Sequence, residues 1–98
     1  MTDEELSIFV DCITYENCTV RFQQETYWCL GLTFDEKTKL YSIGAFVCEN
    51  EPPYNYIREV LSFESPSKDE CMKHFLEDKY WDGKSFYEVA PELEWANL

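Results

Sequence analysis

Residues 27–48 read YWCLGLTFDEKTKLYSIGAFVC, two runs of alternating side chains joined by a short polar segment. Alternation with a period of two is typical of β-strands, because successive side chains point to opposite faces of a sheet. A turn at Asp35–Thr38 would place the apolar sets of both runs on one face, so we predict an antiparallel hairpin. Its register pairs Phe34 with Lys39, Leu32 with Tyr41, Leu30 with Ile43 and Trp28 with Ala45.

This register predicts the core of the protein. A slip of one residue would turn one apolar set toward solvent, so the register decides which side chains are buried. We expect the buried sheet face to carry Trp28, Leu30, Leu32, Tyr41, Ile43 and Val47. We expect the side chains that pack over this face to be Leu6, Phe9, Phe75 and Phe86.

The opposite face of the predicted hairpin collects small residues. They are Cys29, Gly31, Ser42 and Gly44. Glycine inside a strand often marks a place where another backbone comes close. Two interpretations stay open: one of the chain's own helices packs there, or the face is a shallow docking surface with an aromatic rim.

An amphipathic helix is predicted at the start of the chain. Thr2 and Glu5 fit a capping box, in which each side chain accepts a hydrogen bond from the other residue's backbone. The polar and apolar residues that follow, as far as Ile13, fall on opposite sides of a helix. The β-branched content of this segment keeps a strand as the alternative.

Two further helices are predicted near the end of the chain. Ser67 with Glu70, and Ser85 with Glu88, have the spacing of helix-starting caps. Pro91 lacks a backbone donor, so it would kink the last helix or split it into two short turns.

Two more strands complete the predicted sheet. Residues 18–24 alternate in polarity, and residues 57–63 fit a strand better than the helix that is their alternative. The whole chain, residues 1–98, is then a single α+β domain. It consists of an N-terminal helix, a four-stranded antiparallel meander sheet and two C-terminal helices packed on one face.

Charge narrows the classes of partner. Twenty acidic residues against eight basic ones give the 98-residue chain a net charge of −12. Such a chain repels nucleic acids and anionic membranes, and it attracts basic proteins. No apolar run approaches the roughly 20 residues of a membrane helix, and the acidic start MTDEELS is unlike a signal peptide. We therefore expect a cytoplasmic protein, a monomer or weak dimer, whose acidity serves either binding or solubility.

The five cysteines show no CxxC spacing. They are Cys12, Cys18, Cys29, Cys48 and Cys71. Without a secretory context, we expect reduced thiols that pack as small hydrophobic side chains.

Catalytic signals are weak. Cys71 and His74 would share a helix face, but zinc needs three or four protein ligands and the sequence has no second pair of this kind. His74 is the only histidine, so a nucleophile that relies on histidine as its base would need it. We predict no catalytic residues, no metal site and no cofactor, and therefore a protein that is not an enzyme.

Acidic residues and aromatic residues occur together in two loop-like segments. The predicted partner-binding residues are Glu49, Glu51, Tyr54, Tyr56, Glu77, Asp78, Tyr80, Trp81 and Asp82. In class and composition the chain resembles small acidic inhibitors, bacterial immunity proteins and DNA mimics. The resemblance implies a protein-binding domain that neutralises a basic macromolecule such as a toxin or nuclease. The alternative is a small-ligand-binding or enzymatic domain with a pocket between sheet and helices.

Overall fold

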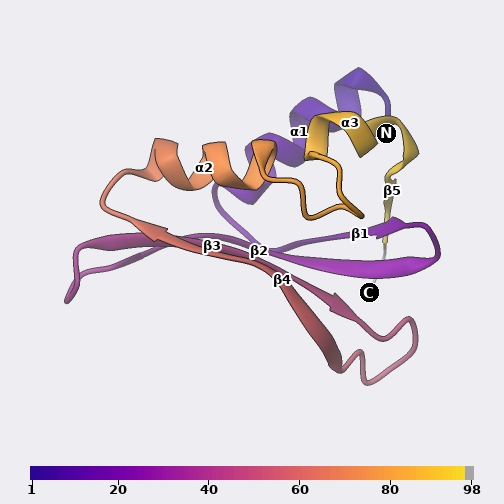
Figure 1. The fold of residues 1–98 in the computed structure, drawn as a ribbon, viewed down its shortest axis with the longest axis horizontal. Coiled ribbons are helices and arrows are strands. Elements are labelled where there is room, and N and C mark those ends of the chain that lie inside the picture. Colours follow the sequence, from indigo (N-terminus) through magenta and orange to yellow (C-terminus); the bar gives the residue numbers. More distant parts are fainter. Residues whose placement is uncertain (97–98) are drawn as a thin grey trace.

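The computed structural model describes residues 1–96, in which an antiparallel sheet carries all the helices on one side (Figure 1). The strand order is β4-β3-β2-β1-β5. The helices are α1 (Asp3–Ile13), α2 (Lys68–Glu77) and α3 (Phe86–Val89), followed by a short 3-10 turn, η1 (Ala90–Glu92). The strands are β1 (Cys18–Phe22), β2 (Glu25–Asp35), β3 (Leu40–Cys48), β4 (Tyr56–Ser65) and β5 (Glu94–Trp95). The predicted α+β class and the helical start of the chain are confirmed.

Local sequence signals set the helix boundaries. Both halves of the capping box between Thr2 and Glu5 are formed at the start of α1. Ser85 and Glu88 form the same arrangement before α3. At α2 the Ser67 hydroxyl accepts a hydrogen bond from the Glu70 N–H at 3.3 Å. Each cap satisfies backbone donors that have no partner inside the helix, which is why these helices begin where predicted.

The end of the chain differs from the prediction. Pro91 splits the expected last helix, as anticipated: α3 stops at Val89 and the chain continues as η1. Beyond η1 the described part of the chain does not return to a helix. Instead Trp95 pairs with Val20 and Glu94 pairs with Arg21, so β5 is a fifth strand beside β1.

The predicted register of the central hairpin is wrong. Asp35 pairs with Leu40, which leaves a four-residue loop in place of the expected turn. Within this loop Lys39 takes a left-handed backbone conformation and its N–H bonds to the Asp35 carbonyl at 2.8 Å. Further along the hairpin, the register shifts by one residue at a bulge between Leu30 and Thr33. A bulge inserts one unpaired residue and so reverses the faces of everything beyond it.

This bulge inverts the predicted face over half of β2. Trp28 and Leu30, expected in the core, point away from the helices and are only half-buried. Cys29 points inward and is fully buried. On the loop side of the bulge, Leu32 and Tyr41 keep the predicted side and pack against the core.

Close backbone contacts explain why glycine occurs at Gly31 in β2 and at Gly44 in β3. At Gly31 a Cβ atom would lie 2.5 Å from the Glu16 carbonyl oxygen, and the Gly31 N–H donates to the Asn17 side chain at 3.0 Å. At Gly44 a Cβ would lie 3.1 Å from the Leu61 carbonyl oxygen. A neighbouring backbone does come close to both glycines, but it belongs to the turn after α1 and to β4, so the interpretation that a helix packs on them is wrong.

Aromatic side chains form the core between the sheet and the helices. Phe9 of α1 stacks on Phe86 of α3 with ring centroids 5.3 Å apart. Trp81 stacks on Tyr27 of β2 at 4.4 Å. Phe75 of α2 is fully buried beside them. The helical residues expected over the sheet are therefore in place, although Leu6 is only half-buried.

Candidate protein-interaction surface

The sheet face opposite the helices is the most distinctive surface of the described residues. In Figure 1 no helix of residues 1–96 lies against it. The pairing pattern determines which side chains point to this side. We call this surface the open face; it consists of Trp28, Leu30, Ser42, Gly44, Phe46, Tyr56, Glu59, Ser62 and Glu64.

Three aromatic side chains form a cluster on the open face. The rings of Phe46 and Tyr56 stack with centroids 4.4 Å apart and an interplanar angle of 8°. Trp28 meets Tyr56 edge-on at 6.5 Å. Tyr56 is 56% exposed, so the cluster presents apolar area to solvent. Exposed aromatic clusters of this kind are typical anchors at protein interfaces.

A shallow depression of about 400 Å³ adjoins this cluster. Leu30 and Phe46 supply its apolar lining, and Gly44 keeps its floor low because it has no side chain. Glu59 and Glu64 line the depression as well, and no lysine or arginine of residues 1–96 does so. The surface therefore combines apolar anchors with uncompensated negative charge.

The one basic residue of β4 lies on the other side of the sheet. Arg58 pairs with Val47 of the core side, whereas Glu59 pairs with Phe46 of the open face. The Arg58 guanidinium makes two hydrogen bonds to Glu25, at 3.0 and 3.2 Å. Because Arg58 pairs with Glu25 on the core side, it does not neutralise the carboxylates of the open face.

The first half of the predicted partner-binding set lies in an ordered loop between β3 and β4. Glu49 and Glu51 are exposed, and Tyr54 is half-buried. The Glu49 carboxylate accepts a hydrogen bond from the Asn55 N–H at 3.1 Å. Asn50 accepts a hydrogen bond from the Thr26 hydroxyl at 2.6 Å, which ties the loop to β2. This loop adjoins the open face through Tyr56, the first residue of β4.

The second half of the predicted set lies elsewhere. Figure 1 shows the segment between α2 and α3 on the helix side of the sheet and the β3–β4 loop on the other side. Glu77 and Asp82 are exposed. Trp81 has 0% exposed area and belongs to the core, so its predicted role as an anchor is wrong. The predicted residues do not form one continuous patch, because the sheet separates the two loops.

Tyr80 is also a structural residue. Its hydroxyl donates to the Phe75 carbonyl at 2.8 Å, and burial raises its pKa well above the ordinary value. The carboxylate of Asp78, the C-cap residue of α2, forms a hydrogen bond with the His74 ring at 2.9 Å. These contacts keep the end of α2 in place, and they leave little of Tyr80 for a partner.

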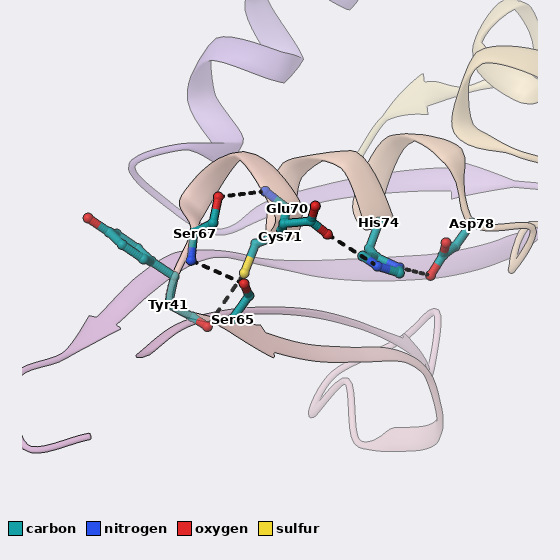
Figure 2. A network of polar contacts seen from close by, with 7 residues as sticks. All are labelled: Tyr41, Ser65, Ser67, Glu70, Cys71, His74 and Asp78. Atoms are coloured by element: carbon teal, nitrogen blue, oxygen red, sulfur yellow. Dashed lines mark hydrogen bonds and ion pairs between the residues drawn. The ribbon is translucent and has the colours of Figure 1, made fainter. Parts of the chain in front are cut away.

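His74 and Cys71 do not form a reactive pair. Figure 2 shows the carboxylates of Glu70 and Asp78 on opposite sides of the His74 ring, at 4.0 and 2.9 Å. The ring also stacks on Phe63 of β4 at 3.7 Å. The Cys71 thiol donates instead to the Tyr41 carbonyl at 3.4 Å. His74 therefore bridges two acids along one helix face and docks α2 on the sheet.

The thiols are poorly suited to chemistry. All five cysteines are free, and only Cys12 is more than slightly accessible. Burial raises the pKa of Cys18 to about 11 and raises the pKa values of Cys29 and Cys71 as well. A buried thiol with a raised pKa is a weak nucleophile, because the thiolate is the reactive form.

Residues 1–96 contain neither a cluster of metal ligands nor a helix that could span a membrane. No group of three or more histidine, cysteine, aspartate or glutamate side chains could hold a metal ion. None of the helices in this part of the chain is long and apolar enough to cross a membrane.

Comparison with known proteins found no match to a family model, to a curated protein or to a solved structure. The architecture therefore defines the class of this protein. It is an α+β domain with helices on one face of an antiparallel sheet and an aromatic, acidic open face on the other.

The sequence prediction found part of the open face, namely Ser42, Gly44 and Tyr56, and missed the rest. It assigned Trp28 and Leu30 to the core, and it did not consider Glu59 and Glu64 as partner-binding residues. Gly31 was the signal that could have corrected the assignment, since an isolated glycine within a strand pattern suggests a bulge.

Proposed function

We propose that this protein binds and neutralises a basic protein partner, such as a toxin or nuclease, through the open face. The observation that carries the proposal is the cluster of Trp28, Phe46 and Tyr56 beside a depression. Glu59 and Glu64 line this depression, and none of the basic residues in the described part of the chain does. Aromatic anchors supply most of the affinity at protein interfaces, and opposite charge supplies orientation and rapid encounter.

Net charge supports the same choice of partner. At −12 the chain attracts basic surfaces from a distance, and this attraction weakens as salt screens the charges. In the proposed complex Glu49 and Glu51, from the loop beside Tyr56, extend the acidic rim. Glu77, Asp78 and Asp82 lie beyond the sheet, so in this proposal they contribute only to the long-range field.

The test is a titration of the protein with a peptide, in which binding is monitored by amide chemical shifts in NMR spectra. The probe is an extended lysine- and arginine-rich peptide with one central aromatic residue; a peptide of the same composition with glutamate for each basic residue is the negative control. We expect the shifts to concentrate on β3, β4 and Trp28. The double variant Glu59→Gln/Glu64→Gln should weaken binding several-fold and reduce its salt dependence.

A matched variant on the helix side controls for net charge. Asp3→Asn/Glu4→Gln removes the same two charges from the exposed first turn of α1 and should leave binding nearly unchanged. The proposal fails if both double variants weaken binding equally, or if the shifts follow the acidic residues over the whole surface. The acidity would then serve solubility.

The alternative function, a small-ligand site between sheet and helices, has a specific observation of its own. A groove of about 400 Å³ lies where the end of α1, the start of α2 and the β2–β3 hairpin meet.

A further inference from the structure

Aromatic and acidic side chains make up half of the lining of the groove at the junction of α1, α2 and the β2–β3 hairpin. Its aromatic members come from three separate places in the chain: Tyr15 after α1, Phe34 in β2 and Tyr41 in β3. Its acidic members are Asp11 of α1 and Asp69 of α2. The volume of about 400 Å³ lies within the range that is usual for small-molecule sites.

Two of the aromatic rings form a fixed corner. Phe34 and Tyr41 pack with centroids 4.7 Å apart at an angle of 50°. The Tyr41 carbonyl accepts a hydrogen bond from the Cys71 thiol. Figure 2 shows the Tyr41 side chain beside the first turn of α2. Because β3 is held to α2 by this contact, the corner is part of the folded framework and needs no partner to form.

The third ring leaves the groove accessible. Tyr15 is 82% exposed and Phe34 is 45% exposed, values that are high for aromatic side chains in a domain with a well-packed core. Leu32 and Met72 complete the apolar lining. The groove is thus an exposed aromatic site on the helix side of the sheet, separate from the open face.

The lining favours a cation over a neutral or anionic ligand. Aromatic faces carry negative quadrupole potential and attract cations within about 6 Å of the ring centre. The two carboxylates add negative charge, and Lys68, the only basic residue that the described part of the chain contributes to this lining, offsets one of them. The C-terminal end of α1 and the N-terminal end of α2 both reach the groove. Their partial charges have opposite signs and offset each other, so the side chains determine the sign of the charge that the groove attracts.

We propose that this groove binds a small organic cation of the alkylammonium class, with a quaternary ammonium group against the rings of Tyr15, Phe34 and Tyr41. Such a group is large and weakly hydrated, so it gains contact with the rings and with the Met72 thioether without a large desolvation cost. Asp11 and Asp69 supply the balancing charge. The proposal does not depend on the function assigned to the open face.

The test compares two probes of nearly equal shape. Choline carries a trimethylammonium group, and 3,3-dimethyl-1-butanol replaces its charged nitrogen with carbon. Each is titrated into the whole protein, and binding is followed by amide and aromatic NMR shifts. We expect choline to bind about tenfold more tightly than the neutral alcohol, with shifts at Phe34, Tyr41 and Met72.

Three variants locate the site. Tyr15→Leu keeps an apolar side chain at an exposed position and should weaken choline binding several-fold without changing the fold. Asp69→Asn should weaken it as well, and Lys68→Gln should strengthen it. The matched control is Tyr87→Leu, which removes another exposed tyrosine from a position outside this groove and should have no effect.

The proposal is overturned if the neutral alcohol binds as tightly as choline, since the groove would then be a merely apolar surface. It is also overturned if choline does not bind, or if Tyr15→Leu and Tyr87→Leu weaken binding equally. None of these outcomes bears on the basic peptide titration, so the two proposals fail or stand separately.

Discussion

The two faces of the sheet are built from neighbouring residues of the same strands, yet they differ sharply in packing. On the helix side Cys29, Ala45 and Val47 have no exposed area. One residue away along each strand, Trp28 and Phe46 remain half-buried on the open face. Both faces carry large apolar side chains, so the presence of such side chains alone does not tell a core from a binding surface. What distinguishes them is whether the chain's own helices cover the face.

The largest expected effect compares one phenylalanine from each side. Phe9→Ala removes a fully buried ring that contacts Phe75, Phe86 and Trp95, and it should destabilise the protein by about 3–5 kcal/mol. Phe46→Ala removes a ring that is only partly buried and should cost less than about 2 kcal/mol. Urea denaturation measures both changes as free energies of unfolding.

Because domains of this size are stable by only about 5–15 kcal/mol, Phe9→Leu serves as a milder variant if Phe9→Ala does not fold. The distinction between the faces is broken if Phe46→Ala destabilises the protein as much as Phe9→Ala. Phe46 would then be part of the core, and its exposure would carry no functional meaning.

An intermediate effect is expected at the two strand glycines. Gly31→Ala would place a methyl group 2.5 Å from the Glu16 carbonyl oxygen, which is held by the backbone, and should cost about 1–3 kcal/mol. Gly44→Ala meets the Leu61 carbonyl oxygen at 3.1 Å. A small shift relieves that contact, and the reduced entropy of the unfolded chain offsets part of the cost, so the change should stay below about 1 kcal/mol.

Thermal unfolding of the two alanine variants measures this order directly. If Gly44→Ala proves the more destabilising of the two, the close approach at the bulge does not explain Gly31. In addition, Gly44→Ala partly fills the depression on the open face, so it should weaken binding of the basic peptide more than it lowers stability.

The smallest effect concerns the acidic caps on the helix side. Hydrogen bonds from the Thr2 backbone N–H and hydroxyl lower the pKa of Glu5 below its ordinary value of 4.5, and Ser85 lowers the pKa of Glu88 in the same way. A carboxylate whose pKa is lowered on folding stabilises the protein at pH values above its ordinary pKa. This contribution is lost as the pH falls through the lowered pKa.

We therefore expect Glu5→Gln/Glu88→Gln to reduce the loss of stability as the pH falls from about 5 to 3. Thermal melts across this range, compared with the wild-type protein, measure the difference. Glu36→Gln, in the exposed β2–β3 loop, is the control. An identical pH dependence in all three proteins would show that the capping carboxylates do not titrate as the geometry predicts.

Local features of the sequence were sufficient for most of the fold. Thr2 with Glu5 and Ser85 with Glu88 predicted helix starts, because a cap needs only residues three positions apart. Pro91 predicted the break in the last helix, because proline lacks a backbone donor wherever it occurs. Alternation predicted the four main strands for a similar reason, since the direction of successive side chains is a property of the extended chain itself.

The faces of those strands were decided by tertiary structure. Glu16 and Asn17 contact the backbone at Gly31, next to the bulge that turns Trp28 and Leu30 outward, and Trp95 becomes a strand residue only because β1 offers a free edge. The candidate sites depend on the same long-range contacts: Trp28 reaches Tyr56 across β3, and Tyr15 shares a groove with Phe34 and Tyr41. Except for β5, sequence alone determined which segments become helices and strands, through interactions between near neighbours. Which side of each strand meets solvent was determined by contacts between residues far apart in the chain.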